Sequence, residues 1–236
     1  MKRAPIPDAT AASPPTTSSK PLLTTMLEAI NLECVRGERQ LFAGLNMTLA
    51  PGQLLHVSGK NGSGKTSFLR ILCGLHKPYA GSVQWRGRAI SSYTDEFNRD
   101  LCYIGHLSGV KEELSPMENL VIASSLAGMK PGTARLLQSL DDFGILDRAE
   151  LPVRYLSQGQ KRRVALARLA LSSTSPLWIL DEPFNALDKA AVSRLRSLLA
   201  AHVLGGGMVV LTTHLDIAID GVEPQHINLD RPRESS

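Results

Sequence analysis

The chain has 236 residues, of which 43% are hydrophobic and 20% are charged, and this composition is typical of one compact domain with a buried core. Its three cysteines, Cys34, Cys73 and Cys102, are scattered and odd in number, which argues against a disulfide framework and matches no metal-binding spacing. The net charge of +4 fits an anionic partner but does not choose among nucleotide, lipid surface and nucleic acid.

The two ends of the chain differ from the rest. Residues 1–25 are mostly Pro, Ala, Ser and Thr, and we expect a disordered tail there rather than a signal peptide. Met26 could equally be the true start. We expect the folded domain over residues 26–230 and a short tail over residues 231–236. No apolar run approaches the ~18 residues of a transmembrane helix, so a transport role would need a separate membrane protein.

Short apolar runs alternate with helical periodicity from Met26 onward. Residues 54–58 predict a strand, and the apolar spacing over residues 66–75 predicts a helix. The glycine-rich segment between them completes a strand–loop–helix unit. Such a unit is typical of the opening of an α/β phosphate-binding fold.

The middle of the chain has a helical pattern. Ser115, Pro116 and Glu118 have the spacing of a capping box with proline at the first helical position, which predicts a helix start. Residues 133–151 keep helical periodicity, interrupted near Gly144. These segments indicate a helical region in the centre of the molecule.

The last third of the chain alternates strands and helices again. Strands are expected over residues 177–180 and 208–211, with a helix over residues 189–202 between them. The whole order predicts an α/β fold with a mostly parallel sheet and an inserted helical subdomain at about residues 107–160.

A glycine-rich loop follows the strand expected over residues 54–58. Residues 59–66 read Gly-Lys-Asn-Gly-Ser-Gly-Lys-Thr, the pattern of a P-loop or Walker A motif. Backbone N–H groups in such a loop converge on phosphate oxygens at a helix N-terminus. Lys65 would reach the β- and γ-phosphates, and the Thr66 hydroxyl would bind Mg²⁺. A chance glycine-rich turn is the alternative, which the flanking strand and helix disfavour. The residues expected to bind nucleotide here are Gly59, Lys60, Asn61, Gly62, Ser63, Gly64, Lys65, Thr66 and Ser67.

Two carboxylates follow the apolar run at residues 177–180. Ligand groups gather at the carboxyl ends of parallel strands, which favours Asp181 and Glu182 as a Walker B motif. Asp181 would hold Mg²⁺, directly or through water, and Glu182 would polarise the attacking water as general base. An acidic pair alone is more often the solvated start of a loop. The P-loop in the same chain favours the catalytic interpretation.

A third motif lies shortly before the acidic pair. Residues 156–160 read Leu-Ser-Gln-Gly-Gln and precede a basic helix, and they resemble the LSGGQ signature of ATP-binding-cassette (ABC) proteins. The run is also a capping box with Ser157 as cap and Gln160 at the third helical position, which accounts for those two residues but not for Gly159.

Two further runs complete the resemblance to ABC proteins. Residues 185–188, Asn-Ala-Leu-Asp, resemble the D-loop, and residues 212–214, Thr-Thr-His, resemble the H-loop. A lone surface histidine is the alternative for His214, and the ordered set of motifs makes that alternative poor. The chain is thus identified as a member of the ABC family, with the P-loop NTPase fold of its nucleotide-binding domains.

The resemblance implies a head-to-tail homodimer with two ATP molecules at its interface. Ser157, Gly159 and Gln160 of one copy would contact the nucleotide bound to the P-loop of the other. His214 would contact the γ-phosphate and help hold the attacking water. Hydrolysis would open the dimer and move a membrane partner.

Two positions depart from the family pattern. Arg36 stands where an aromatic residue usually stacks on adenine, and its planar guanidinium can still stack on a base, although base selectivity is then in doubt. His106 stands where a glutamine normally meets Mg²⁺ and couples to the membrane subunit. Drift at a tolerant position is the alternative for His106.

The segment around His106 also resembles one branch of the family. Ile-Gly-His at residues 104–106, the Gly-x-Lys that ends at Lys111, and Glu-Asn-Leu at residues 118–120 are similar to the ATPase subunits of cytochrome c maturation haem exporters. The resemblance implies a multi-span membrane subunit, haem-handling partners and a peripheral location on the cytoplasmic face of the inner membrane.

Three alternatives stay open at this point. The chain could serve an exporter of another cargo such as lipid or peptide, or act as a soluble ABC ATPase in DNA repair or translation. The second is disfavoured because no second cassette, coiled coil or zinc insertion is visible, and we expect no nucleic-acid partner. An inactive cassette is disfavoured because Lys65, Asp181, Glu182 and His214 are all present. The sequence does not name the cargo.

Overall fold

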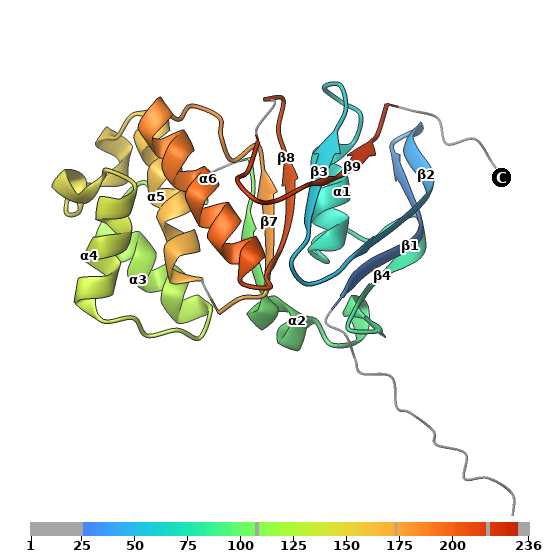
Figure 1. Ribbon diagram of the computed structural model, residues 1–236, viewed down its shortest axis with the longest axis horizontal. Helices are drawn as coiled ribbons and strands as arrows, with labels where there is room; N and C mark the ends of the chain where they lie inside the picture. Colours follow the sequence, from blue (N-terminus) through green and yellow to red (C-terminus); the bar gives the residue numbers. More distant parts are fainter. Residues whose placement is uncertain (1–25, 107–108, 173, 216–217, 231–236) are drawn as a thin grey trace, which may run out of the picture.

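The computed structural model describes residues 26–106, 109–172, 174–215 and 218–230. The two expected tails lie outside these residues, so the domain limits stay predictions. The described chain forms two sheets with helices between and beside them (Figure 1). None of the described helices is both long enough and apolar enough to span a bilayer.

The parallel sheet carries the functional loops. Its strand order is β6-β7-β8-β3-β9, and all its pairings are parallel. Every residue of β7 and of β8 is buried, as expected for strands covered on both faces. This confirms the α/β fold and the predicted strands. The five strands are β3 (Leu54–Ser58), β6 (Leu101–Ile104), β7 (Leu177–Asp181), β8 (Met208–Thr212) and β9 (Gln225–Asn228).

A second, antiparallel sheet has the strand order β2-β1-β4-β5 and was not anticipated from the sequence. Its alternation is interrupted by register shifts, for example in β1 between Ile30 and Glu33 opposite β4. At that irregularity Gly81 has φ +85°, and a Cβ there would lie 2.3 Å from the Asn31 carbonyl oxygen, so only glycine fits. The strands are β1 (Leu27–Arg36), β2 (Arg39–Leu49), β4 (Ala80–Trp85) and β5 (Arg88–Ala89).

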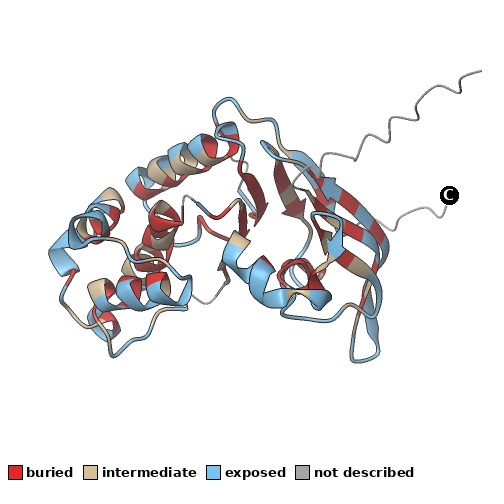
Figure 2. Cartoon of the chain, turned by 90° about the horizontal axis from the view of Figure 1, so that it is seen from below, coloured by how far each residue is buried: buried red, intermediate tan, exposed pale blue. Residues whose placement is uncertain are grey.

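Alternate side chains of the parallel sheet belong to two different cores. Leu177 and Ile179 of β7 pack with the antiparallel sheet and the first helix, whereas Trp178 and Leu180 pack with the helical layer on the other face. The period-2 alternation of strand side chains makes this division. Buried residues accordingly occupy the inside of both layers, and the outer helix faces are exposed (Figure 2).

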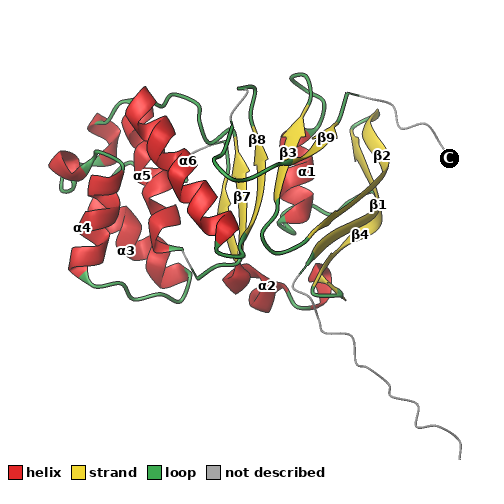
Figure 3. Cartoon of the chain, in the orientation of Figure 1, coloured by secondary structure: helices red, strands yellow, loops and turns green. Residues whose placement is uncertain are grey.

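The helices begin and end at local signals. Ser115 and Ser157 each form a capping box, as expected, and Asp188 caps the helix that follows it. The first helix ends at Leu72 rather than at residue 75, because Gly74 takes a left-handed conformation with φ +72°. The helices are α1 (Lys65–Leu72), α2 (Thr94–Asp100), α3 (Pro116–Leu126), α4 (Thr133–Asp142), α5 (Gln158–Leu171) and α6 (Lys189–Leu204), as Figure 3 shows. Short 3₁₀ turns cover Ile90–Ser92, Leu146–Arg148 and Val153–Tyr155.

A histidine is packed against the core where α6 meets β7. The His202 ring stacks on Trp178, with ring centroids 3.7 Å apart and planes 4° apart. A Cβ on Gly207 would lie 2.3 Å from His202 Nε2, so the backbone also closes over the ring. Burial lowers the pKa of His202 to about 4, because the charged imidazolium is poorly solvated there.

We expect this histidine to make stability depend on pH. Its folded pKa of about 4 lies below the ordinary value of 6.5, so protons bind the unfolded chain more tightly. Its contribution is complete above pH 6.5 and is lost as the pH falls toward 4. Between pH 7.5 and 5 the loss should be at most about 2 kcal/mol, because the ring is partly exposed. Urea denaturation of His202→Gln should remove this dependence, whereas the exposed His76→Gln should keep it.

Candidate functional site

A cavity of about 650 Å³ lies at the carboxyl end of the parallel sheet. Eleven of the predicted site residues line it, and it also takes in Arg39, Leu41 and Asn185. Six predicted residues do not line it: Gly59, Lys60, Ser63, Ser157, Gly159 and Gln160. The eleven that do are Arg36, Asn61, Gly62, Gly64, Lys65, Thr66, Ser67, His106, Asp181, Glu182 and His214.

The glycine-rich loop wraps the start of α1. Gly64 is the N-cap of α1 with φ +104°, and a Cβ there would meet Leu41 Cβ at 3.1 Å. Lys65 is only 8% exposed, and its Nζ donates to the carbonyl oxygens of Gly59 at 2.7 Å and Lys60 at 3.3 Å. The helix N-terminus and the ammonium group together place positive potential at the cavity wall, which suits a phosphate group.

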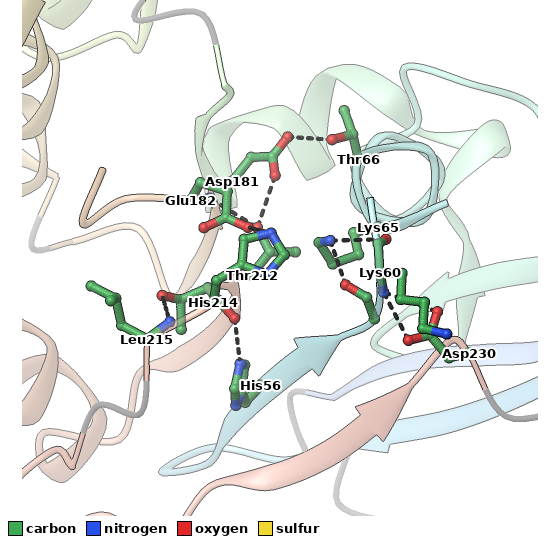
Figure 4. Close-up of polar contacts among 12 residues, drawn as sticks. His56, Lys60, Lys65, Thr66, Asp181, Glu182, Thr212, His214, Leu215 and Asp230 are labelled. Carbon is green, nitrogen blue, oxygen red and sulfur yellow. Dashed lines mark hydrogen bonds and ion pairs between the residues drawn. The ribbon is translucent and has the colours of Figure 1, made fainter. Parts of the chain in front are cut away.

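Asp181 joins three elements through its carboxylate. The hydroxyls of Thr66 on α1 and Thr212 on β8 each donate to it at 2.8 Å, and the Glu182 N–H donates to Thr212 Oγ1 at 2.8 Å (Figure 4). The pairing of Asp181 with Thr212 across β7 and β8 brings these groups together. The Thr66 hydroxyl and Asp181 carboxylate are hard oxygen donors side by side, a set that fits Mg²⁺.

Glu182 and His214 line the cavity in contact with each other. His214 Nε2 lies 3.2 Å from Glu182 Oε1, and Figure 4 shows the two side chains pointing toward each other. Beyond this contact, both Glu182 carboxylate oxygens are buried without a hydrogen-bond partner among the described residues. Glu182 also has φ +49°, a conformation that costs energy for a residue with a Cβ. A strained, buried and unsatisfied carboxylate is well suited to accept a proton from water.

Arg162 on α5 binds the backbone around Asp181 and Glu182 and was not predicted from the sequence. Its guanidinium is 5% exposed and donates to the carbonyl oxygens of Gly105 at 2.8 Å, Asp181 at 2.7 Å and Glu182 at 2.9 Å. Burial lowers the pKa of Arg162, and the nearby Asp181 and Glu182 carboxylates oppose that shift. Arg162 lies between Lys161 and Arg163, in a basic run that resembles a solvated helix face. Only its burial in the fold distinguishes Arg162 from its two neighbours.

The signature segment lies apart from the cavity of its own chain. The side chains of Ser157 and Gln160 form the capping box of α5, and Ser157 is exposed. Gly159 has a separate structural reason to be glycine, because a Cβ there would lie 2.6 Å from the Ala186 carbonyl oxygen. The N-terminus of α5 therefore does not contribute to the cavity beside the P-loop of the same chain.

Replacing the buried guanidinium should destabilise the protein. In Arg162→Lys a single ammonium nitrogen replaces two guanidinium nitrogens and cannot reach all three carbonyl oxygens at once, so we expect the free energy of unfolding to fall by about 1–3 kcal/mol. Chemical denaturation measures this change. Arg148→Lys, at a half-exposed surface ion pair, is the matched control and should change stability by less than about 0.5 kcal/mol. Equal effects of both variants would contradict the bracing role.

The sequence matches the family described as ABC transporter over residues 42–185. Among solved structures, the ATP-binding subunit of an ABC transporter is similar with a TM-score of 0.74 and 26% identity, covering 81% of this chain and 80% of that one. A dimeric ATP-binding cassette bound to ADP and Pi shares the fold, with a TM-score of 0.70 and 24% identity over 80% of this chain and 88% of that one.

Curated relatives are more similar still, and those compared bear the name cytochrome c biogenesis ATP-binding export protein CcmA. The Dechloromonas aromatica protein is 54% identical over 82% of this chain and 95% of its own length. The Nitrosomonas europaea protein is 45% identical over 91% and 99%, and a Vibrio vulnificus protein 46% identical over 86% and 99%. The chain belongs to the ABC transporter family of ATPases and, within it, to the group of cytochrome c biogenesis ATP-binding export proteins.

Proposed function

We propose that this ATPase binds Mg–ATP in the cavity at the carboxyl end of the parallel sheet and drives a multi-span membrane subunit that serves haem export. The observation that carries the proposal is the buried Glu182 carboxylate, held against His214 on the side of the cavity that faces the P-loop. The phosphate-binding loop, the general base Glu182 and the polarising side chain of His214 then line one cavity.

Each side chain has a distinct role in this mechanism. Lys65 and the loop N–H groups bind the β- and γ-phosphates, where negative charge grows as the reaction proceeds. Glu182 accepts the proton of the attacking water, whose oxygen bonds to the γ-phosphorus while the bond to the β–γ bridging oxygen breaks. His214 holds the water and the γ-phosphate. Thr66 and Asp181 would hold Mg²⁺, which neutralises phosphate charge when bound.

The adenine base of the nucleotide would lie at the arginine-lined end of the cavity. Arg36 and Arg39 come from β1 and β2, and Leu41 lies beside them. Guanidinium planes stack on bases without reading their hydrogen-bonding edges, which supports binding through Arg36 with weak base selectivity.

We infer that the signature acts in a second copy of the chain. Ser157, Gly159 and Gln160 lie outside the cavity of their own chain, and Ser157, the N-cap of α5, is exposed. A head-to-tail dimer would bring that N-terminus to the γ-phosphate of the partner's nucleotide, where N–H groups stabilise negative charge. The same geometry supports an ATP-dependent homodimer.

The membrane subunit would dock in a cleft next to His106. A hollow of about 490 Å³ is lined by Arg70, Leu75, His76, Tyr103, Ile104, Gly105, His106, Gly109 and Arg168. His106 lines both this cleft and the nucleotide cavity, so it can relate the two. The coupling segment that we propose covers residues 106–114, of which residues 107 and 108 lie outside the described chain. Docking there would make the protein peripheral on the cytoplasmic face of the inner membrane.

The assignment of Glu182 as general base predicts a trapped ATP complex. Glu182→Gln keeps the shape of the side chain but cannot accept the proton, so phosphate release should fall about 10²–10⁴-fold while ATP still binds. Gel filtration with ATP should then detect a dimer. Lys65→Ala is the control that should lose ATP binding and remain monomeric. Full turnover by Glu182→Gln would contradict the role of the carboxylate and the trapped dimer together.

The haem assignment predicts a defect in cytochrome maturation. Deletion of the gene should abolish covalent haem in c-type cytochromes, measured by haem staining and spectroscopy, and the wild-type gene should restore it. His106→Gln should also restore maturation, because it provides the glutamine common in the family. His106→Ala should hydrolyse ATP but fail to restore it. Normal cytochromes in the deletion strain would reject haem and favour another export cargo, such as lipid or peptide.

A further inference from the structure

One residue of the glycine-rich loop has a partner outside the nucleotide cavity. The Lys60 N–H donates to both carboxylate oxygens of Asp230, at 2.9 Å to Oδ1 and 2.8 Å to Oδ2, as Figure 4 shows. Neither Lys60 nor Asp230 lines the cavity. The carboxylate thus holds the loop from its outer side, away from the cavity.

The approach of Asp230 follows from the pairing of β9 with β3. The Leu229 N–H donates to the Ser58 carbonyl oxygen at 3.0 Å, which extends that pairing up to the start of the loop. Asn228 Oδ1 accepts from the Asp230 N–H at 2.8 Å and turns the chain back toward the loop. The carboxylate is therefore placed by the sheet and by its own turn.

The same peptide groups are held from the inner side by Lys65. Its Nζ binds the carbonyl oxygens of Gly59 and Lys60, while Asp230 binds the Lys60 N–H between them. Gly59 is also crowded, because a Cβ there would lie 2.5 Å from Ser63 Oγ and 3.5 Å from Asp230 Oδ1. The first turn of the loop is thus fixed by an ammonium group on one side and a carboxylate on the other.

We propose that Asp230 is a positioning residue for ATP binding, which presets the P-loop by holding the Lys60 N–H. A loop already in its binding conformation loses less conformational entropy when the phosphates arrive, so affinity rises. Asp230 does not line the cavity, and it would act through the backbone of Lys60. This inference rests on the proposed nucleotide site.

The effect on affinity separates this role from two simpler ones. A residue that only anchors the segment after β9 would change the melting temperature. The Kd for ATP, measured well below that temperature, would stay unchanged. A carboxylate that mainly repels phosphate would weaken binding, and its removal would tighten it. Presetting requires that removal weakens binding and that the amide variant, which still accepts a hydrogen bond, retains most of it.

The test compares Asp230→Ala, Asp230→Asn and the control Glu223→Ala, which removes the same charge from the same terminal segment. Glu223 is exposed and lines a different hollow. Titration with ATP should give a Kd raised about 3- to 10-fold for Asp230→Ala, with kcat at saturating ATP within about twofold of wild type. Asp230→Asn should lie close to wild type, and Glu223→Ala should equal it.

Circular dichroism should show that all three variants are folded at the assay temperature. An Asp230→Ala Kd equal to or lower than that of wild type would overturn the positioning role and leave the nucleotide site intact. A loss of kcat at unchanged Kd would overturn it as well. Wild-type protein that bound no ATP would reject the proposed site itself, and this inference with it.

Discussion

The carboxylate of Asp181 is the interaction on which the rest of the site depends. It is 1% exposed, and it accepts hydrogen bonds from hydroxyl donors on α1 and β8. Hydrogen bonds to a charged group are strong enough to offset much of the cost of burying it. Because Thr212 also accepts from the Glu182 N–H, one group fixes the P-loop helix, the strand end and the base relative to each other.

Holding Glu182 in a left-handed conformation costs energy, and the cost is met by backbone contacts around it. Arg162 binds the carbonyl oxygens of Asp181 and Glu182 and so fixes the peptide units on which the base depends. It comes from α5, whose N-terminus is the signature segment. A displacement of α5 would therefore be transmitted to Glu182 through the hydrogen bonds of Arg162. The third hydrogen bond of Arg162 would transmit it to Gly105, beside His106.

Features with local signals could be predicted from the sequence, and features made by long-range packing could not. The strands β3, β7 and β8 and both capping boxes were predicted because apolar runs and cap residues act within a few positions. The antiparallel sheet was missed because its register shifts break the alternation that would reveal it. Arg39 was missed because only the fold brings it to the cavity, and Arg162 and Asp230 were missed because the fold supplies their partners.

Gly159 illustrates why a motif alone does not explain its residues. The signature interpretation needs glycine there for a phosphate contact in a partner subunit, whereas the fold needs it because Ala186 approaches its backbone closely within the same chain. Ala186 itself has φ +61°, so the D-loop is bent to make that approach. The two requirements are compatible, since the Ala186 contact joins the signature to the D-loop. The close approach of Gly159 to Ala186 thus places the proposed partner contact next to the loop that follows Glu182.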